Sequence, residues 1–349
     1  METTENIFCR QIIDIAVGHG VCTAFCSPGS RNTPLLVALD SVSSVCKRVV
    51  VDERSAAFQA LGYAMVSRRP VLLVCTSGTA VLNYAPAVAE AYYAGIPLIV
   101  LSADRPSEWI DQDDSQTIRQ YGVLNHVVKG SFDVRAIPEG AGREYSSHQR
   151  WNVNRVVNEA MVKALHGKPG PVHINVQLSE PLGLISDTSL PVQRKVTYIG
   201  GSGSLSGRCL AGLAIRAAGA RILVVAGFAP PDSALHDALR RFASLPNVAV
   251  MAETIANLHD PRPLSTMVDS VLCRMSAEER RRMCPDIVIS FGGALVSRML
   301  KQFLREVEPA SHWNVGHSNY FCDCFKALTE IIDAVSYTHL RAHETLSDL

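Results

Sequence analysis

The amino-acid sequence predicts an α/β protein built from two doubly wound parallel-sheet domains. Short runs rich in β-branched residues alternate with longer helical patterns from one end of the chain to the other. Most of these runs are nearly continuous in apolar residues, which is typical of parallel strands covered on both faces. A polar stretch without periodicity, residues 178–196, separates two such alternations. We therefore expect a first domain over residues 1–184, a linker over 185–200 and a Rossmann-like domain over 201–334.

The first half contains six candidate strands with helical segments between most of them. Glycines stand where three of these helices would end, a position that favours a residue tolerant of positive φ. They are Gly20, Gly95 and Gly167. The strands are expected at CTAFCS (22–27), KRVVVD (47–52), VLLVCT (71–76), PLIVLS (97–102), HVVK (126–129) and PVHINV (171–176), and the helices at 6–20, 33–40, 53–69, 79–95 and 150–167.

The second half repeats the alternation. Helices are expected at 204–218, 231–242, 296–306 and 322–334, and strands at 221–227, 248–253, 286–292 and 312–316. The final stretch, VSYTHLRAHETLSDL, has neither an apolar period nor a helix cap. We expect residues 335–349 to be non-native, and the native chain to continue beyond residue 334.

Composition narrows the class of protein. The 349 residues are 47% hydrophobic and 19% charged, and Lys plus Arg equals Asp plus Glu at 33 each. A net charge of zero argues against a nucleic-acid partner bound through phosphate electrostatics. No apolar run is long enough to span a bilayer, and the start METTENIFCRQ lacks the features of a secretory signal. The 10 cysteines contain no CxxC pair, so we expect reduced thiols in a cytoplasmic protein.

The glycine-rich stretch IGGSGSLSG (199–207) admits two interpretations. Its glycines precede a helical pattern, as in a dinucleotide-binding turn, but their spacing is GxGxxxG. The following strand, RILVVAGF, also ends without an acidic residue to hold a ribose. The end of a flexible linker is the favoured interpretation. The sequence has no P-loop either.

Four small polar loops follow successive strands of the first domain, at the sheet edge where ligands bind in open parallel sheets. In SPGSRN (27–32), Ser30 can cap the next helix, and Arg31 offers a fork suited to a carboxylate. A solvated surface arginine is the alternative. The other three loops are DERSAAF (52–58), CTSGTA (75–80) and SADRPSE (102–108).

Glu53 opens a helix directly after an apolar strand. A simple explanation is that its charge complements the helix dipole, and the alternative is a carboxylate directed at a ligand. Arg105 and the amide of Gln116, from SQTIRQ (115–120), lie in the loops at the same predicted edge. Two arginines, an amide and hydroxyl groups together predict a pocket for an acidic metabolite.

These motifs resemble, in this order, the pyrimidine-binding domain of thiamine-diphosphate enzymes. Their combination is most similar to the synthases of menaquinone biosynthesis that make 2-succinyl-5-enolpyruvyl-6-hydroxy-3-cyclohexene-1-carboxylate. The segment GPVHINVQLSEPL (170–182) also resembles the end of that domain. The resemblance covers residues 1–185 closely and reaches residue 334 more loosely. It implies a transferase that decarboxylates 2-oxoglutarate and adds the succinyl carbanion equivalent to isochorismate.

The resemblance also implies roles for single residues. Glu53 would hydrogen-bond the aminopyrimidine of thiamine diphosphate and favour its imino tautomer. Thr76, Ser77 and Gly78 would line the cofactor side of the pocket. The predicted substrate ligands are Ser30, Arg31, Arg105, Gln116 and, in the second domain, Arg298, for which a solvated helix arginine is the alternative.

The resemblance further implies parts that this sequence lacks. In such enzymes a third domain with a Gly-Asp-Gly signature holds the cofactor diphosphate through Mg²⁺ or Mn²⁺, and no such signature occurs here. We expect this chain alone to be inactive and the intact enzyme to be a homodimer or homotetramer. Two alternatives stay open: another thiamine-diphosphate decarboxylase or carboligase of 2-oxo acids, and a non-catalytic α/β nucleotide-binding module.

Overall fold

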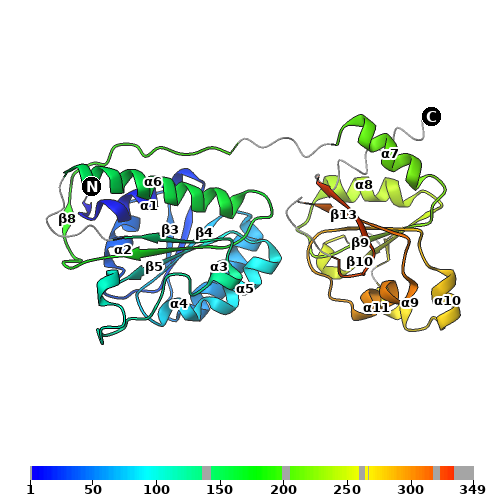
Figure 1. Ribbon diagram of the computed structural model, residues 1–349, viewed down its shortest axis with the longest axis horizontal. Helices are drawn as coiled ribbons and strands as arrows, with labels where there is room; N and C mark the ends of the chain where they lie inside the picture. The colour runs from blue at the N-terminus through cyan, green and yellow to red at the C-terminus, as the bar shows by residue number, and fades with distance from the viewer. Residues whose placement is uncertain are drawn as a thin grey trace. The chain divides into compact units, whose positions relative to one another are not determined.

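The chain forms two compact units, residues Met1–Ile199 and Gly200–Leu349 (Figure 1). The computed structural model describes residues 2–135, 143–198, 205–258, 264–265, 267–316 and 323–333. The predicted tail 335–349 and most of the glycine-rich stretch, residues 199–204, lie outside the described residues. The finer scheme of residues 1–184, 185–200 and 201–334 stays a prediction.

The first unit is built on a six-stranded sheet with the order β3-β2-β4-β5-β7-β6, in which every neighbouring pair is parallel. Every residue of β4 and β5 is buried, as expected for strands covered on both faces. The strands are β2 (Thr23–Cys26), β3 (Cys46–Val49), β4 (Val71–Cys75), β5 (Leu98–Asp104), β6 (Ser131–Val134) and β7 (Val172–Gln177).

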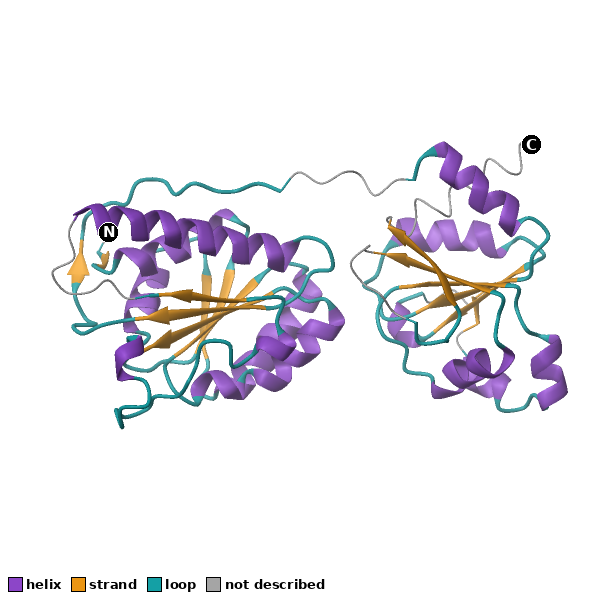
Figure 2. Ribbon diagram, in the orientation of Figure 1, coloured by secondary structure: helices purple, strands orange, loops and turns teal. Residues whose placement is uncertain are grey.

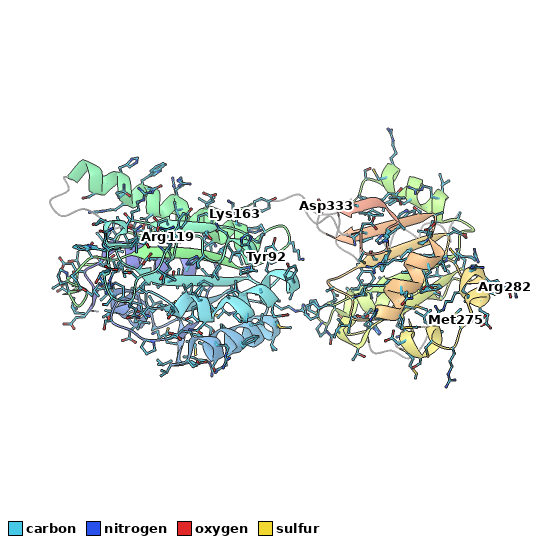
Figure 3. The ribbon with its side chains drawn as sticks, turned by 60° about the horizontal axis from the view of Figure 1, so that its bottom comes forward. Tyr92, Arg119, Lys163, Met275, Arg282 and Asp333 are labelled. Carbon is cyan, nitrogen blue, oxygen red and sulfur yellow. The ribbon has the colours of Figure 1, made fainter. Side chains whose placement is uncertain are left out.

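Helices cover both faces of this sheet (Figure 2). One apolar core joins the sheet to α1 (Ile7–Gly18), α2 (Thr33–Asp40) and α6 (Arg143–Leu165). A second core joins the opposite face to α3 (Glu53–Ser67), α4 (Ala80–Asn83) and α5 (Ala85–Ala94). On α6, Lys163 pairs with Glu159 at 2.9 Å, and its ammonium lies 5.3 Å from the ring centre of Phe132 (Figure 3). The sheet is thus doubly wound, as predicted.

Part of the predicted linker is ordered on the first unit. Residues Ile185–Ser186 form β8, which pairs antiparallel with β1 (Thr3–Thr4) near the N-terminus. Farther along, Asn158 of α6 donates a hydrogen bond to the carbonyl of Arg194 (3.0 Å) and accepts one from the amide of Val196 (2.7 Å). Residues 187–196 therefore run over α1 and α6 as an extended segment, called the strap below.

The second unit contains another parallel six-stranded sheet, with the order β11-β10-β9-β12-β13-β14. Apolar cores lie on both of its faces. The strands are β9 (Ile222–Ala226), β10 (Val248–Ala252), β11 (Leu264–Ser265), β12 (Ile287–Phe291), β13 (Ser311–Gly316) and β14 (Leu328–Asp333), and the helices are α7 (Gly207–Ala217), α8 (Ser233–Ala243), α9 (Val268–Leu272), α10 (Ala277–Arg282) and α11 (Arg298–Val307).

Two element predictions are wrong. Residues 125–127 form the short 3-10 helix η2 (Asn125–Val127) where strand HVVK was expected, and the strand beside β7 is β6, a few residues later. Residues 328–333 form the edge strand β14 where a helix was expected, because Leu328–Asp333 pairs in parallel with β13 and Ile332 packs into the core. In the described part of the chain, no helix is long and apolar enough to cross a membrane.

Candidate functional site

The carboxyl ends of β2 and β4 flank the point at which the first sheet changes winding direction. From β2 the chain passes to β3 on one side, and it later returns to β4 on the other. Ligands bind at such switch points because the two following loops diverge and leave a crevice. The loops concerned are residues 27–32 and 76–79, the SPGSRN and TSGT segments of the sequence.

These two loops are in close contact. The amide of Ser27 donates to the carbonyl of Val74 at 2.8 Å. A Cβ atom on Gly29 would lie 2.5 Å from the Cβ of Thr76, so only glycine allows this approach. The buried side chain of Asn32 accepts from the amide of Gly29 and donates to the carbonyl of Ser27, both at 2.9 Å.

The prediction that Ser30 caps α2 is wrong. The helix begins at Thr33 with Asn32 at the cap position, and no side chain there bonds a helix amide. The side chain of Asn32 is instead turned back into its own loop. Ser30 is exposed, and its carbonyl accepts from the amide and the hydroxyl of Thr33 at 3.2 and 2.8 Å. Its hydroxyl therefore faces outward at the rim of the loop.

Arg31 lies largely buried at this edge, with 11% of its side chain exposed. Its Nη1 donates to the carbonyl of Leu178 at 3.0 Å, and its Nη2 lies 3.2 Å from the Oε1 of Glu180. Burial lowers the pKa of Arg31, and the positive charge of Arg105 acts in the same direction. The two arginines are therefore close enough for their positive charges to act on each other.

Arg105 follows β5 and is held by its own loop. Its guanidinium pairs with Asp114 and donates to the hydroxyl of Ser115 at 3.3 Å. In the same loop, Arg119 pairs with Asp111 at 2.7 Å (Figure 3). Arg31 and Arg105, the residues at this edge that are predicted to bind a carboxylate, thus each hold an acidic side chain in this structure. Arg31 holds Glu180, and Arg105 holds Asp114. An incoming carboxylate would compete with these groups.

Gln116 and the TSG segment form one contact. The Nε2 of Gln116 donates to the carbonyl of Ser77 at 3.1 Å. Gly78 has φ +80, a backbone conformation that favours glycine. A Cβ there would also lie 2.9 Å from the Cγ of Gln116, which is a second reason for glycine at this position. Thr76 and Ser77 are buried. The structure thus brings Gln116 beside the three residues expected to line the cofactor side.

Glu53 is the first residue of α3, immediately after Asp52, which caps the helix by accepting from the amide of Ser55 at 2.7 Å. Its side chain is half-buried, and among the described residues its carboxylate has no hydrogen bond or ion pair. Burial raises the pKa of Tyr84 well above its usual range, and the charge of Glu53 adds to that rise, which places the carboxylate near this buried phenol. Glu53 thus has a free acceptor at the sheet edge.

Arg298 belongs to the second unit. It is the first residue of α11, it is exposed, and Ser297 caps the helix by accepting from the amide of Leu300 at 2.9 Å.

The sequence interpretation missed Gln120, Asp104 and Asn175 as members of the site. Asp104 and Asn175 are buried beside the loops above, and burial raises the pKa of Asp104 to about 6. A signal was present: His173, Asn175 and Gln177 alternate in an otherwise apolar run, and residues two apart in a strand share a face. That period places a polar stripe inside the sheet.

The residues present suit one half of the expected cofactor better than the other. A free carboxylate, small loop residues and buried hydroxyls can accommodate an aminopyrimidine ring at the edge of the first sheet. In the described ranges, no group of three or more His, Cys, Asp or Glu side chains could hold a metal ion.

Comparison with known proteins gives three kinds of similarity. Residues 8–123 match the family model described as thiamine pyrophosphate enzyme, N-terminal TPP binding domain. Two curated relatives are named 2-succinyl-5-enolpyruvyl-6-hydroxy-3-cyclohexene-1-carboxylate synthase. The relative from Porphyromonas gingivalis is 42% identical over 322 residues, covering 92% of this chain and 54% of the relative. That from Desulfotalea psychrophila is 38% identical over 338 residues, covering 95% and 62%.

Among solved structures, benzoylformate decarboxylase from Polynucleobacter necessarius matches with a TM-score of 0.65 and 17% identity, over 97% of this chain and 61% of that one. At this identity the match shows the fold alone. The chain spans little more than half the length of the curated relatives it matches. The α/β class and the family resemblance predicted from the sequence are confirmed by these similarities.

Proposed function

We propose that this chain, whose first domain belongs to the N-terminal TPP binding domain family of thiamine pyrophosphate enzymes, supplies the pyrimidine-binding and carboxylate-binding part of a 2-succinyl-5-enolpyruvyl-6-hydroxy-3-cyclohexene-1-carboxylate synthase. The proposed reaction decarboxylates 2-oxoglutarate and joins the remaining four-carbon unit to isochorismate. One observation carries this proposal: Glu53 offers a free carboxylate at the sheet edge that also bears two neighbouring arginines.

In this proposal Glu53 holds the cofactor in its reactive form. Thiamine diphosphate, when bound, supplies the electron sink for decarboxylation of a 2-oxo acid. The carboxyl group of Glu53 would hydrogen-bond a ring nitrogen of the pyrimidine and favour its imino tautomer, while Thr76, Ser77 and Gly78 would contact the face of the ring. Mg²⁺ or Mn²⁺ would be held by groups other than the described residues.

Arg31, Arg105 and Gln116 would hold the acidic substrates, with Ser30 at the rim. Both proposed substrates carry carboxylates, and a guanidinium can bind a carboxylate through two parallel hydrogen bonds. Holding a substrate in this way orients it beside the reacting carbon and excludes other arrangements. Glu180 and Asp114, which occupy the two arginines here, would be displaced by the substrate. Arg298 would contribute from the second domain.

An apolar surface beside Glu53 supports a homodimer. Val49, Val51, Phe58, Met65 and Val66 are all exposed around β3 and α3. Contiguous exposed apolar surface marks protein–protein or membrane interaction sites, and a second copy of this chain is the partner proposed here. Val66→Glu should then dissociate the enzyme in sedimentation experiments, and Val192→Glu, at another well-exposed valine in the strap, should not. The nine described cysteines are free thiols, which supports a cytoplasmic location.

The test of the proposed function is the substitution Glu53→Gln, which keeps the shape and removes the charge. Because the chain spans 54% of the Porphyromonas gingivalis relative, activity is best assayed in a chimera with the C-terminal remainder of that enzyme. With 2-oxoglutarate and isochorismate, we expect a rate loss of roughly a thousandfold or more. Asp52→Asn, at the neighbouring cap, is the matched control. Full activity of Glu53→Gln would refute the proposal, and unchanged activity of Arg31→Ala would refute its substrate assignment.

A further inference from the structure

A continuous chain of buried polar side chains joins the cofactor-side loop to the arginine-bearing loop. The Oε1 of Gln120 accepts from the amide of Gly78 at 3.0 Å. The Nε2 of Gln120 donates to the Oδ1 of Asn175 at 2.8 Å, and the Nδ2 of Asn175 donates to the Oδ2 of Asp104 at 2.9 Å. At the far end, the Oδ1 of Asp104 accepts from the amide of Arg105 at 2.8 Å. Four hydrogen bonds thus connect Gly78 with Arg105.

The direction of every bond in this chain is fixed by its two ends. The Nδ2 of Asn175 faces two carboxylates, Asp104 and Asp133, at 2.9 and 3.0 Å, and an ionised carboxylate can only accept. The amide oxygen of Asn175 must therefore face Gln120. Gln120 in turn must direct its own oxygen at the amide of Gly78, which can only donate. Neither amide can flip without losing partners.

Burial makes a broken bond costly. Gln120 and Asn175 are each 1% exposed and Asp104 is 3% exposed, so water does not readily replace a lost partner. Gln120 also donates to the carbonyl of Ala103 at 2.9 Å, and this contact links the hydrogen-bonded network to β5. A network in which each member is satisfied moves as a unit, because any single displacement leaves a buried group unpaired.

We propose that Gln120 and Asn175 are positioning residues that hold the Gly78 loop and the Arg105 loop in one fixed relation. What the two loops bind rests on the function proposed above, but their coupling does not. Gln120 and Asn175 touch neither substrate nor cofactor in this scheme. They act through Gly78, which packs on Gln116, and through the backbone of Arg105.

The experiment is amide hydrogen exchange of this chain by mass spectrometry, with Gln120→Leu compared with wild type. Gly78 loses its own acceptor in this variant, so faster exchange there is expected of any model. The informative amide is that of Arg105, which Gln120 does not contact. We expect its exchange to rise on the order of tenfold, the effect of losing about one buried hydrogen bond.

A second variant, Gln120→Glu, tests the bond to Gly78 separately from the bond to Asn175. It also replaces Gln120→Leu in the experiment if that variant does not fold. The glutamate still accepts from Gly78 but no longer donates to Asn175, so Gly78 should stay protected while Arg105 exchanges faster. Asn158→Leu is the matched control, because Asn158 is equally buried at 1% exposed and, among the described residues, bonds only to His19, α6 and the strap. Unchanged exchange at Arg105 in both Gln120 variants, or an equal rise in Asn158→Leu, would overturn the proposal. Neither cofactor nor substrate is present, so failure here is distinct from failure of the Glu53→Gln test.

Discussion

Acid should destabilise the second unit through one buried histidine, His312. Its side chain is 1% exposed, its Nε2 is bonded to Ser290 Oγ at 2.6 Å, and its ring lies 4.9 Å from that of Phe325. Burial lowers the pKa of His312 to about 4, against 6.5 for an ordinary histidine, and Asp323 only partly opposes this. The folded unit therefore keeps the imidazole neutral over a range in which the unfolded chain binds a proton.

The direction and size of the change in stability with pH follow from the difference between the folded and unfolded pKa values of His312. Above the unfolded pKa of 6.5, neither state is protonated and the full stability is present. As the pH falls toward 4, the unfolded state gains a proton that the folded state does not take, so the free energy of unfolding drops. Each pH unit corresponds to about 1.4 kcal/mol, and two units below 6.5 give a loss of roughly 2–3 kcal/mol.

The assay is urea unfolding of wild type and of His312→Gln, followed by tryptophan emission. Trp313 is 2% exposed in the second unit, whereas Trp109 and Trp151 are about half exposed in the first, so the emission shift reports mainly on the second unit. We expect His312→Gln to be less stable near neutral pH and this deficit to shrink by roughly 2–3 kcal/mol near pH 4.5. His173→Gln, in the first unit, is the control and should leave the Trp313 transition unchanged. Parallel stability curves for His312→Gln and wild type would refute the reasoning.

Two further predictions test packing and thiol access. Gly29→Ala should lower the free energy of unfolding by about 1–3 kcal/mol, because its Cβ would overlap Thr76, whereas Gly62→Ala, with no atom within 4 Å, should raise it by about 0.5–1 kcal/mol. Thermal unfolding measures both, and equal effects would contradict the close approach of the two loops. Burial raises the pKa of the deepest thiols, so a thiol reagent applied to the native chain should modify the exposed cysteines well before the buried ones, as peptide mapping can show. The exposed set is Cys46, Cys209 and Cys273, and the buried set is Cys9, Cys26 and Cys75.

Helices and strands with a strong local pattern could be predicted from the sequence. Segments whose structure depends on pairing with a distant strand could not. Runs such as 71–76 and 97–102 consist mainly of Val, Ile and Leu, and each became a central strand. The run HVVK has the same propensity but turns into η2, because the strand that reaches β7 is Ser131–Val134. Residues 328–333 fit a helix locally, and their pairing with β13 overrides that preference.

Some residues of the candidate site could likewise be predicted from the sequence, and others could not. Strand-end loops with glycine and arginine could be found from the sequence because ligand edges follow from parallel-sheet topology, and Arg31, Arg105 and Gln116 do lie at one edge. The acidic partners Glu180 and Asp114 could not be found, because each contact depends on the fold of a loop. Asn175 lay within reach, since its polar stripe is visible in PVHINV, but its partners on three other segments are not.

The order of strands in the first sheet has a consequence for synthesis of the protein on the ribosome. β7 lies between β5 and β6, so those two earlier strands cannot complete the sheet until residue 177 has emerged. Thr3 and Thr4 wait longer, because their partners are Ile185 and Ser186 at the far end of the same unit. Thr3 and Thr4 precede every other strand of the unit in the chain, yet they are among the last to find their partners. The nascent chain must keep its apolar strands apart from other chains over that whole interval, which is when aggregation competes with folding.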